Sequence, residues 1–285
     1  MLEAVRLFRT PDALRDQFAI QISCSNPSRE KNMITSLISM KGGTAKTTTA
    51  VNLAAYLALG QFKTLLIDLD PQTFATIYLG VEIQEAKVSM SDVLLKGSDL
   101  CDAICPTRIP NMDLIPSDRR LASVDLLLAA TCGREEKLRQ KLEPIRDGYD
   151  YILIDNAPSL NLLSVNALVA SDNYVITVSP SFFSMVGLQT LLETVEVIKK
   201  NMDLKVELLG ILPTLVDLRM KITSEYIELL RSHFQEKVFR TVIRQNVKLL
   251  ESPAHGKTIF EYDSGCVGAL CYIYFGKEFL ARCTS

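Results

Sequence analysis

The chain has 285 residues, of which 48% are apolar and 22% are charged, and its formal net charge is −2. This composition excludes disordered, collagen-like and low-complexity proteins, and it provides a core for one large domain or two small ones. No apolar run reaches the ~18 residues that a membrane-spanning helix needs, so we expect no such helix.

The N-terminal part of the chain is predicted to be an appendage. Residues 12–20 have a helical pattern, and residues 23–32 contain Pro27 and several turn-forming residues, which predict a loop. A segment of this length is too short to be a domain of its own. We therefore divide the chain into an appendage over residues 1–32, which could be flexible, and one domain over residues 33–285.

From residue 33 onward, short apolar runs alternate with longer segments of helical periodicity. Runs rich in Ile, Val and Leu predict strands over residues 34–39, 64–69, 151–154, 174–178 and 206–212. Helical periodicity predicts helices over residues 47–59, 121–128, 160–170, 187–199 and 224–234. This alternation indicates a doubly wound α/β fold, in which a mostly parallel sheet has helices on both faces and binds ligands at the carboxyl ends of its strands.

The segment between the first strand and the first helix reads Lys-Gly-Gly-Thr-Ala-Lys-Thr-Thr-Thr, residues 41–49. Glycines let the backbone wrap closely around phosphate oxygens, and the start of the helix adds its dipole. The segment predicts an ATP site in which Lys46 reaches the β- and γ-phosphates and Thr47 ligates Mg²⁺. Ala45 stands where such loops usually have glycine, and alanine resists a positive φ. The residues expected to contact the nucleotide are Lys41, Gly42, Gly43, Thr44, Ala45, Lys46, Thr47 and Thr48.

The second lysine of this loop carries a family resemblance. Lys-Gly-Gly-x-x-Lys-Thr, with Lys41 five residues before Lys46, resembles the deviant Walker A loop of the ParA/MinD family of ATPases. The resemblance implies a P-loop NTPase fold and a homodimer that sandwiches two ATP molecules. It also implies that Lys41 crosses the dimer interface, so that Lys41 and Lys46 both neutralise charge during hydrolysis.

Three further strand ends are similar to motifs of this family. In Leu-Leu-Ile-Asp-Leu-Asp-Pro-Gln, residues 65–72, the resemblance makes Asp68 the carboxylate that positions the attacking water and places residues 70–72 in a switch region. In Tyr-Ile-Leu-Ile-Asp, residues 151–155, it places Asp155 near Mg²⁺. In residues 210–217, it places Pro213 and Thr214 beside the adenine.

The C-terminal third is similar to one branch of the family. Residues 241–248 and 251–257 resemble the corresponding region of Soj-like proteins of chromosome and plasmid partition. The resemblance implies a cytoplasmic, nucleoid-associated ATPase whose ATP-bound dimer binds nonspecific DNA and whose hydrolysis releases it. It also implies slow turnover that a centromere-binding ParB-like partner stimulates.

The DNA-binding residues are expected in a locally basic stretch. Residues 219–257 contain eight Lys and Arg against four acids, whereas the whole chain is slightly acidic. Such a stretch binds phosphates by charge alone and therefore in a salt-sensitive way. The predicted contacts are Arg219, Lys221, Arg244, Lys248 and Lys257.

Two alternatives lead to different functions. A MinD-like regulator would end in a basic amphipathic helix on a membrane, but Lys277 and Arg282 are the only basic residues of the last segment, so we expect that helix to pack on the core. A scaffold or positioning regulator would use ATP only as a dimer switch and would not act on DNA. The seven cysteines include no Cys-x-x-Cys pair, so buried reduced thiols are expected, and neither a zinc site nor an iron–sulfur cluster is.

Overall fold

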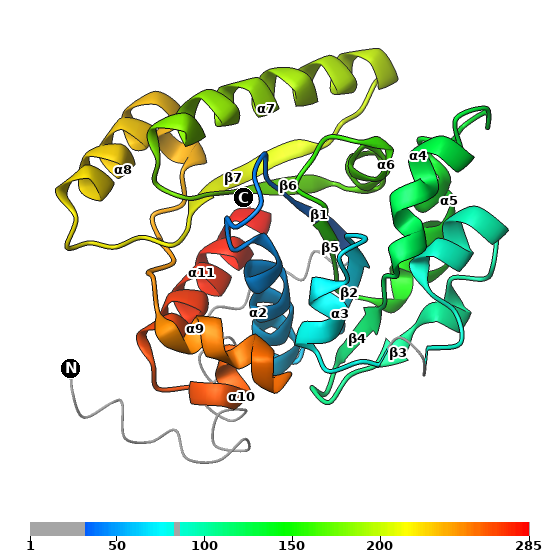
Figure 1. Ribbon diagram of the computed structural model, residues 1–285, viewed down its shortest axis with the longest axis horizontal. Helices are drawn as coiled ribbons and strands as arrows, with labels where there is room; N and C mark the ends of the chain where they lie inside the picture. Colours follow the sequence, from blue (N-terminus) through cyan, green and yellow to red (C-terminus); the bar gives the residue numbers. More distant parts are fainter. Residues whose placement is uncertain (1–31, 83–85, 285) are drawn as a thin grey trace.

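The structure, a computed structural model, describes residues 32–82 and 86–284, and a seven-stranded sheet forms its centre (Figure 1). The strand order is β3-β4-β2-β5-β1-β6-β7, and every neighbouring pair is parallel except β3 and β4. The strands are β1 (Met33–Ile38), β2 (Thr64–Leu69), β3 (Cys105–Pro106), β4 (Met112–Ile115), β5 (Tyr151–Asn156), β6 (Asn173–Val178) and β7 (Glu207–Pro213). The doubly wound, mostly parallel α/β fold predicted from the sequence is therefore confirmed.

Helices cover both faces of the sheet. The longer ones are α2 (Lys46–Leu59), α6 (Leu162–Ala170), α7 (Phe182–Met202), α8 (Lys221–Phe234) and α11 (Val267–Cys283). The shorter ones are α3 (Phe74–Tyr78), α4 (Val124–Leu127), α5 (Lys137–Leu142), α9 (Val247–Glu251) and α10 (Ile259–Asp263). One π-helical turn, Asp92–Lys96, and short 3-10 turns at Cys101–Ala103, Arg119–Ser123, Glu143–Gly148, Gln235–Lys237 and Ser252–His255 complete the described elements.

The alternation of side chains along each strand builds a separate core on each face. In β1, Leu37 packs with α2 and α11, whereas Ile34 and Ile38 point to the other face, where α4 to α8 lie. Because both faces are covered, β1, β2, β5 and β6 consist almost entirely of buried residues. This burial explains why these strands were predictable as apolar runs without a polar side.

The last helix, α11, packs on the core, as its sequence predicts. Gly276 of α11 lies directly against the ring of Tyr56 in α2, and the hydroxyl of Tyr272 is 3.2 Å from that of Thr49. In Figure 1 α11 and α2 lie side by side on one face of the sheet. Over residues 32–82 and 86–284, no helix has both the length and the apolar character needed to cross a membrane.

The structure differs from the predicted elements in two places. The predicted helix over residues 121–128 is a 3-10 turn followed by the single turn α4, whose Leu126 and Leu127 are exposed. A short apolar run of this kind can match a helical period without forming a long helix. The edge strand β3 and its neighbour β4 were not predicted, because they have only two and four residues. The predicted appendage and its helix lie outside the described residues, apart from Asn32.

Candidate phosphate-binding site

A cavity of about 350 Å³ lies at the carboxyl end of the sheet, where the β1–α2 loop faces α3. This is the edge at which parallel α/β sheets bind their ligands. All eight nucleotide-binding residues predicted within residues 41–48 line it as one continuous loop. The lining residues are Ser39, Lys41, Gly42, Gly43, Thr44, Ala45, Lys46, Thr47, Thr48, Asp70, Phe74, Ile77, Tyr78, Pro158 and Pro253.

The loop has the backbone of an anion-binding turn. Gly43 has φ +74° and Ala45 has φ +54°, and Ala45 directly precedes the first turn of the 14-residue helix α2. Left-handed residues before a helix turn successive N–H groups toward one point, where the helix dipole is also positive. Ala45 thus adopts the conformation that glycine usually provides, and its carbonyl accepts from the N–H and hydroxyl of Thr49, at 2.9 and 2.7 Å.

Hydrogen bonds from β6 and β7 fix the middle of the loop. The hydroxyl of Thr44 lies 3.0 Å from that of Thr177, which belongs to β6. The hydroxyl of Thr214 donates to the carbonyls of Thr44 and Val178, at 2.8 and 3.0 Å. Thr214 is fully buried and supports the loop through these hydrogen bonds. Neither Thr214 nor Pro213 lines the cavity, and their contact with adenine stays a prediction.

Lys46, which lines the cavity, forms a buried ion pair with Asp155. Lys46 Nζ lies 2.7 Å from Asp155 Oδ1, and the two side chains are 6% and 0% exposed. Within the part of the chain that the structure describes, Asp155 Oδ2 has no hydrogen-bond partner although it is buried. An unpaired buried carboxylate oxygen is costly, and a divalent cation or its bound water would satisfy it. Asp155, together with Thr47 on the cavity wall, therefore fits the predicted Mg²⁺ site.

Asp68 does not lie on the cavity. It is part of β2, pairs in register with Asp155 of β5 and is 0% exposed. Its carboxylate accepts from the N–H of Asp70 (3.1 Å) and from the N–H and hydroxyl of Thr76 (2.9 and 2.7 Å). Burial first, and the charge of Asp155 second, raise the pKa of Asp68 to about 7. Asp68 therefore does not line the cavity in this structure, and the water-positioning role that the family resemblance implies for it stays a prediction.

Asp70 is the carboxylate that the structure places on the cavity wall. It follows the last residue of β2, and its Oδ1 accepts from the N–H of Gln72 at 2.9 Å. Burial raises the pKa of Asp70, while the Gln72 N–H and the charge of Lys46 oppose that rise. The strand boundary carried this signal in the sequence, because an acid inside a doubly covered strand is enclosed, whereas an acid just beyond the strand end faces the ligand edge.

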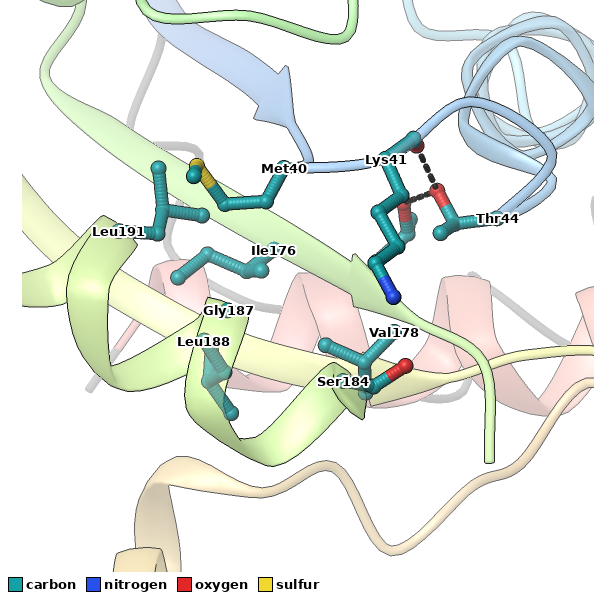
Figure 2. A pocket seen from close by; sticks show the side chains of 10 residues that line it. Met40, Lys41, Thr44, Ile176, Val178, Ser184, Gly187, Leu188 and Leu191 are labelled. Carbon is teal, nitrogen blue, oxygen red and sulfur yellow. Dashed lines mark hydrogen bonds between the residues drawn. The ribbon is translucent and has the colours of Figure 1, made fainter. Parts of the chain in front are cut away.

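The side chain of Lys41 extends away from the phosphate loop. Figure 2 shows it reaching along the end of β6 toward Val178 and Ser184, over a narrow groove whose floor includes Ile176 and Leu188. The carbonyl of Lys41 accepts from the hydroxyl of Ser39 at 3.1 Å. Lys41 thus lines this second groove as well as the phosphate cavity, and it lies on an exposed part of the molecule.

Sequence reasoning missed the wall formed by α3 and the C-terminal segment. Tyr78 lines the cavity, and its hydroxyl accepts from Asn52 Nδ2 (3.1 Å) and lies 2.8 Å from the hydroxyl of Ser252. Asn52 Oδ1 in turn accepts from the N–H of Ile259 at 2.8 Å. These contacts join α2 and α3 to the turn that begins at Ser252 and to the first residue of α10. Each residue alone is an ordinary polar side chain, so the sequence contained no signal for them.

The predicted DNA-binding residues are exposed or half-exposed and differ in their partners. The bridge between Val216 and Arg244 brings the β7–α8 loop beside the segment that follows α8. Arg219 is 88% exposed and forms two hydrogen bonds with Asp217, and Lys221 is 90% exposed and 3.5 Å from Glu225. Lys248 pairs with Glu251 at 2.9 Å. Over the described residues, Arg244 and Lys257 form no salt bridge, so their charges are uncompensated by direct contact.

Comparison with known proteins gives consistent matches. The family model described as an AAA domain matches residues 32–208. The sporulation initiation inhibitor protein Soj of Bacillus subtilis is 41% identical over 249 residues, which cover 87% of this chain and 98% of Soj. The chromosome partitioning protein ParA of Caulobacter vibrioides is 36% identical over 260 residues, 90% of this chain and 96% of that protein.

Solved structures show the same fold. Cobyrinic acid a,c-diamide synthase of Mycobacterium smegmatis with bound ADP and magnesium has a TM-score of 0.77 and 27% identity, and the match covers 89% of this chain and 96% of that one. The cell division ATPase MinD of Pyrococcus furiosus has a TM-score of 0.71 and 23% identity, with 88% and 99% of the two chains covered. At that identity the second likeness concerns the fold alone.

Proposed function

The chain belongs to the ParA/MinD family of ATPases, and on that premise we propose that it is a ParA-type partition ATPase that binds DNA as an ATP-bound dimer and is released by hydrolysis. One observation carries the ATPase part: Lys46 of the glycine-containing loop, which is paired with Asp155, lines the same cavity as the carboxylate of Asp70. The names of the relatives Soj and ParA support the partition role.

The ion pair between Lys46 and Asp155 would open when ATP binds. The phosphates offer Lys46 a more negative partner, and the charge released on Asp155 would then face the metal side of the cavity, next to Thr47. Bound Mg²⁺ would supply charge neutralisation on the β- and γ-phosphates. The crystal structure of the relative with ADP and magnesium supports this pair of ligands.

Asp70 would orient the water that attacks the γ-phosphorus. It is the carboxylate among the residues that line the cavity, and Phe74 and Ile77 add apolar side chains to the same lining. No arginine is among the residues that line the described cavity, so we expect slow hydrolysis until another charge assists. Lys41, which is exposed, would reach the nucleotide of a second protomer, and a ParB-like protein would be the stimulating partner.

DNA retention in three nucleotide states tests this proposal. The protein at low salt is applied to immobilised duplex DNA with Mg·ATP, Mg·ADP or no nucleotide, and its mass is measured by light scattering in parallel. We expect a dimer and DNA retention with ATP only, and neither in Lys46→Ala, which lacks the charge for the phosphates. A fluorescent fusion should follow the nucleoid.

The same experiment separates the alternatives. An ATP-dependent dimer that never retains DNA would identify a scaffold or positioning regulator. Binding to anionic liposomes with ATP would favour a MinD-like role, although the apolar side of α11 is already buried against α2. ATP affinity in Lys46→Ala equal to that of the unaltered protein, measured by calorimetry, would refute the assignment of the loop.

A further inference from the structure

The carboxylate of Asp68 accepts three hydrogen bonds from the protein and is not exposed to solvent, so its role in the fold is that of a buried hydrogen-bond acceptor. Its partners are the N–H of Asp70, the N–H of Thr76 and the hydroxyl of Thr76, at 3.1, 2.9 and 2.7 Å. Asp68 and Thr76 are both 0% exposed. Each partner belongs to the segment that leaves β2 and enters α3, so Asp68 ties both ends of that segment to the sheet.

A second connection closes this set of contacts into a ring. The N–H of Ser117, which follows β4, donates to the hydroxyl oxygen of Thr76 at 3.1 Å. The hydroxyl of Ser117 donates to the carbonyl of Asp70 at 2.6 Å. The backbone of Asp70 is therefore fixed at two points. Its N–H donates to Asp68, and its carbonyl accepts from Ser117. Thr76 hydrogen-bonds to both Asp68 and Ser117 and so connects them. Ser117 is also 0% exposed.

When the carboxylate of Asp68 is ionised, the donors and acceptors of the ring can be paired in only one way. The N–H of Ser117 is a donor, so the single proton of the Thr76 hydroxyl points to Asp68, and the hydroxyl of Ser117 gives its proton to the Asp70 carbonyl. Both oxygens of Asp68 must accept. An asparagine there would turn its NH₂ group toward one of the donors and leave it unpaired, which explains why a carboxylate occupies this enclosed place.

From this ring we infer that Asp68, Thr76 and Ser117 are positioning residues, which fix the backbone on both sides of Asp70 and so aim its carboxylate at the phosphate cavity. The inference rests on the proposed ATPase function. It gives Asp68 a role in hydrolysis without contact with water or nucleotide. The ring leaves the phosphate loop itself untouched, since its four residues come from β2, the β2–α3 segment, α3 and the segment after β4.

Thr76→Val tests the inference, because valine keeps the shape and removes the hydroxyl that both accepts and donates. We expect kcat for Mg·ATP hydrolysis to fall about tenfold to a hundredfold, since a small displacement of a positioning group has effects of this size. The affinity for ATP, measured with a fluorescent analogue, should change less than about twofold, because the phosphate loop is intact. Thr76→Ser keeps the hydroxyl and should recover most of kcat.

Two controls separate positioning from general damage. Thr64→Val removes a buried hydroxyl at the opposite end of β2, where Thr64 donates to Phe62 O, and should leave kcat unchanged although stability falls. In an Asp70→Ala background, Thr76→Val should lower the residual rate no further, because the ring acts through Asp70.

The outcomes are decisive for the inference. A folded Thr76→Val protein with an unchanged kcat would overturn it, and so would an equal loss of rate in the Asp70→Ala background. If the unaltered protein does not hydrolyse ATP, the proposed function fails instead. If the unaltered protein is active and loses its activity in Asp70→Ala but not in Thr76→Val, the proposed function is supported and the positioning role of the ring is refuted.

Discussion

At the scale of the residue, Ala45 shows how one substitution can be accommodated in a tight loop. Its φ of +54° is a conformation that costs a residue with a Cβ atom about 1–2 kcal/mol. The loop adopts it nonetheless, because Thr44 is held by β6 and β7 and the carbonyl of Ala45 starts α2. The geometry of the phosphate loop is thus imposed by its surroundings, and the local preference of alanine is overruled.

Ala45→Gly should therefore stabilise the protein. We expect the free energy of unfolding to rise by about 1 kcal/mol and the melting temperature by ~2–4 °C, because glycine adopts a positive φ without steric strain. Circular dichroism during heating measures the shift. Ala54→Gly, in the middle of α2, is the matched control and should lower stability by about 1 kcal/mol. A loss of stability in Ala45→Gly would show that the positive φ of Ala45 does not strain the folded protein.

Asp68 should make stability depend on pH. Its pKa is about 7 in the folded protein, against 3.8 as the ordinary value, so between these pH values the folded state binds a proton that the unfolded state lacks. The free energy of unfolding should therefore fall as the pH rises from about 4 to about 7, by up to ~1.4 kcal/mol per unit, and should level off above that range.

Urea unfolding at several pH values, with a chelator and without nucleotide, measures this slope. The raised pKa of Asp70 acts in the same direction, so the comparison is between the unaltered protein and Asp68→Asn. The variant should be less stable overall, because it loses an acceptor, and its slope should be shallower. Identical slopes in the two proteins would show that Asp68 is ionised throughout the range.

At the scale of the element, the close packing of α11 on α2 determines how the C-terminal segment is held. A Cβ atom on Gly276 would lie 2.1 Å from Tyr56 Cδ1, a distance at which one helix must move. Tyr56 is 1% exposed and belongs to α2, the helix that follows the phosphate loop, and α2 and α11 share one hydrophobic core. The contact therefore links the position of α11 to the helix whose first residue is Lys46.

Gly276→Ala should destabilise the protein by about 1–3 kcal/mol, the usual cost of adding a methyl group to a filled core. Urea unfolding gives the difference directly. Gly148→Ala serves as the control, because the added Cβ would meet no atom within 4 Å and the residue has no positive φ, and it should change stability little. An unaffected Gly276→Ala protein would mean that Tyr56 can move aside without cost.

At the scale of the whole molecule, the folded chain brings two parts of the basic stretch side by side, with Arg219, Lys221 and Arg244 as the exposed cations of this surface. The β-bridge at Arg244 places it next to the loop that carries Arg219 and Lys221. Two of these cations already have acidic partners, Asp217 and Glu225, which DNA phosphates would have to replace. A phosphate competes well with an exposed carboxylate, because an exposed ion pair contributes only ~0–1 kcal/mol.

Combined replacement of Arg219, Lys221 and Arg244 by Ala should weaken ATP-dependent binding to all duplexes about equally, because phosphate contacts contain no base information. The slope of log affinity against log salt should become shallower by roughly one unit for each lost contact. Retention of DNA on a sensor surface at several salt concentrations measures both effects, and ATP binding and dimerisation should persist.

A triple variant at a distance gives the control. Lys63, Lys96 and Arg139 are exposed cations outside this surface, and the last two also have acidic partners, Asp92 and Glu136. Their replacement by Ala removes the same charge and should leave the salt slope near that of the unaltered protein. Equal losses in the two triple variants would indicate that net charge alone, and not this surface, governs binding.

The sequence by itself determined the α/β class, five of the seven strands, the phosphate loop with Lys46 and Thr47, and the family. These features are encoded locally: apolar runs mark doubly covered strands, and glycines and lysines at fixed spacing mark a phosphate loop. Only the tertiary structure shows how different the surroundings of Asp68 and Asp70 are, although the two residues are two positions apart. Their difference depends on Thr76 and Ser117, which enclose Asp68 from other segments, while Asp70 emerges beyond the strand end. In the same way, the supporting role of Thr214 depends on contacts between segments distant in the chain, which no local pattern specifies.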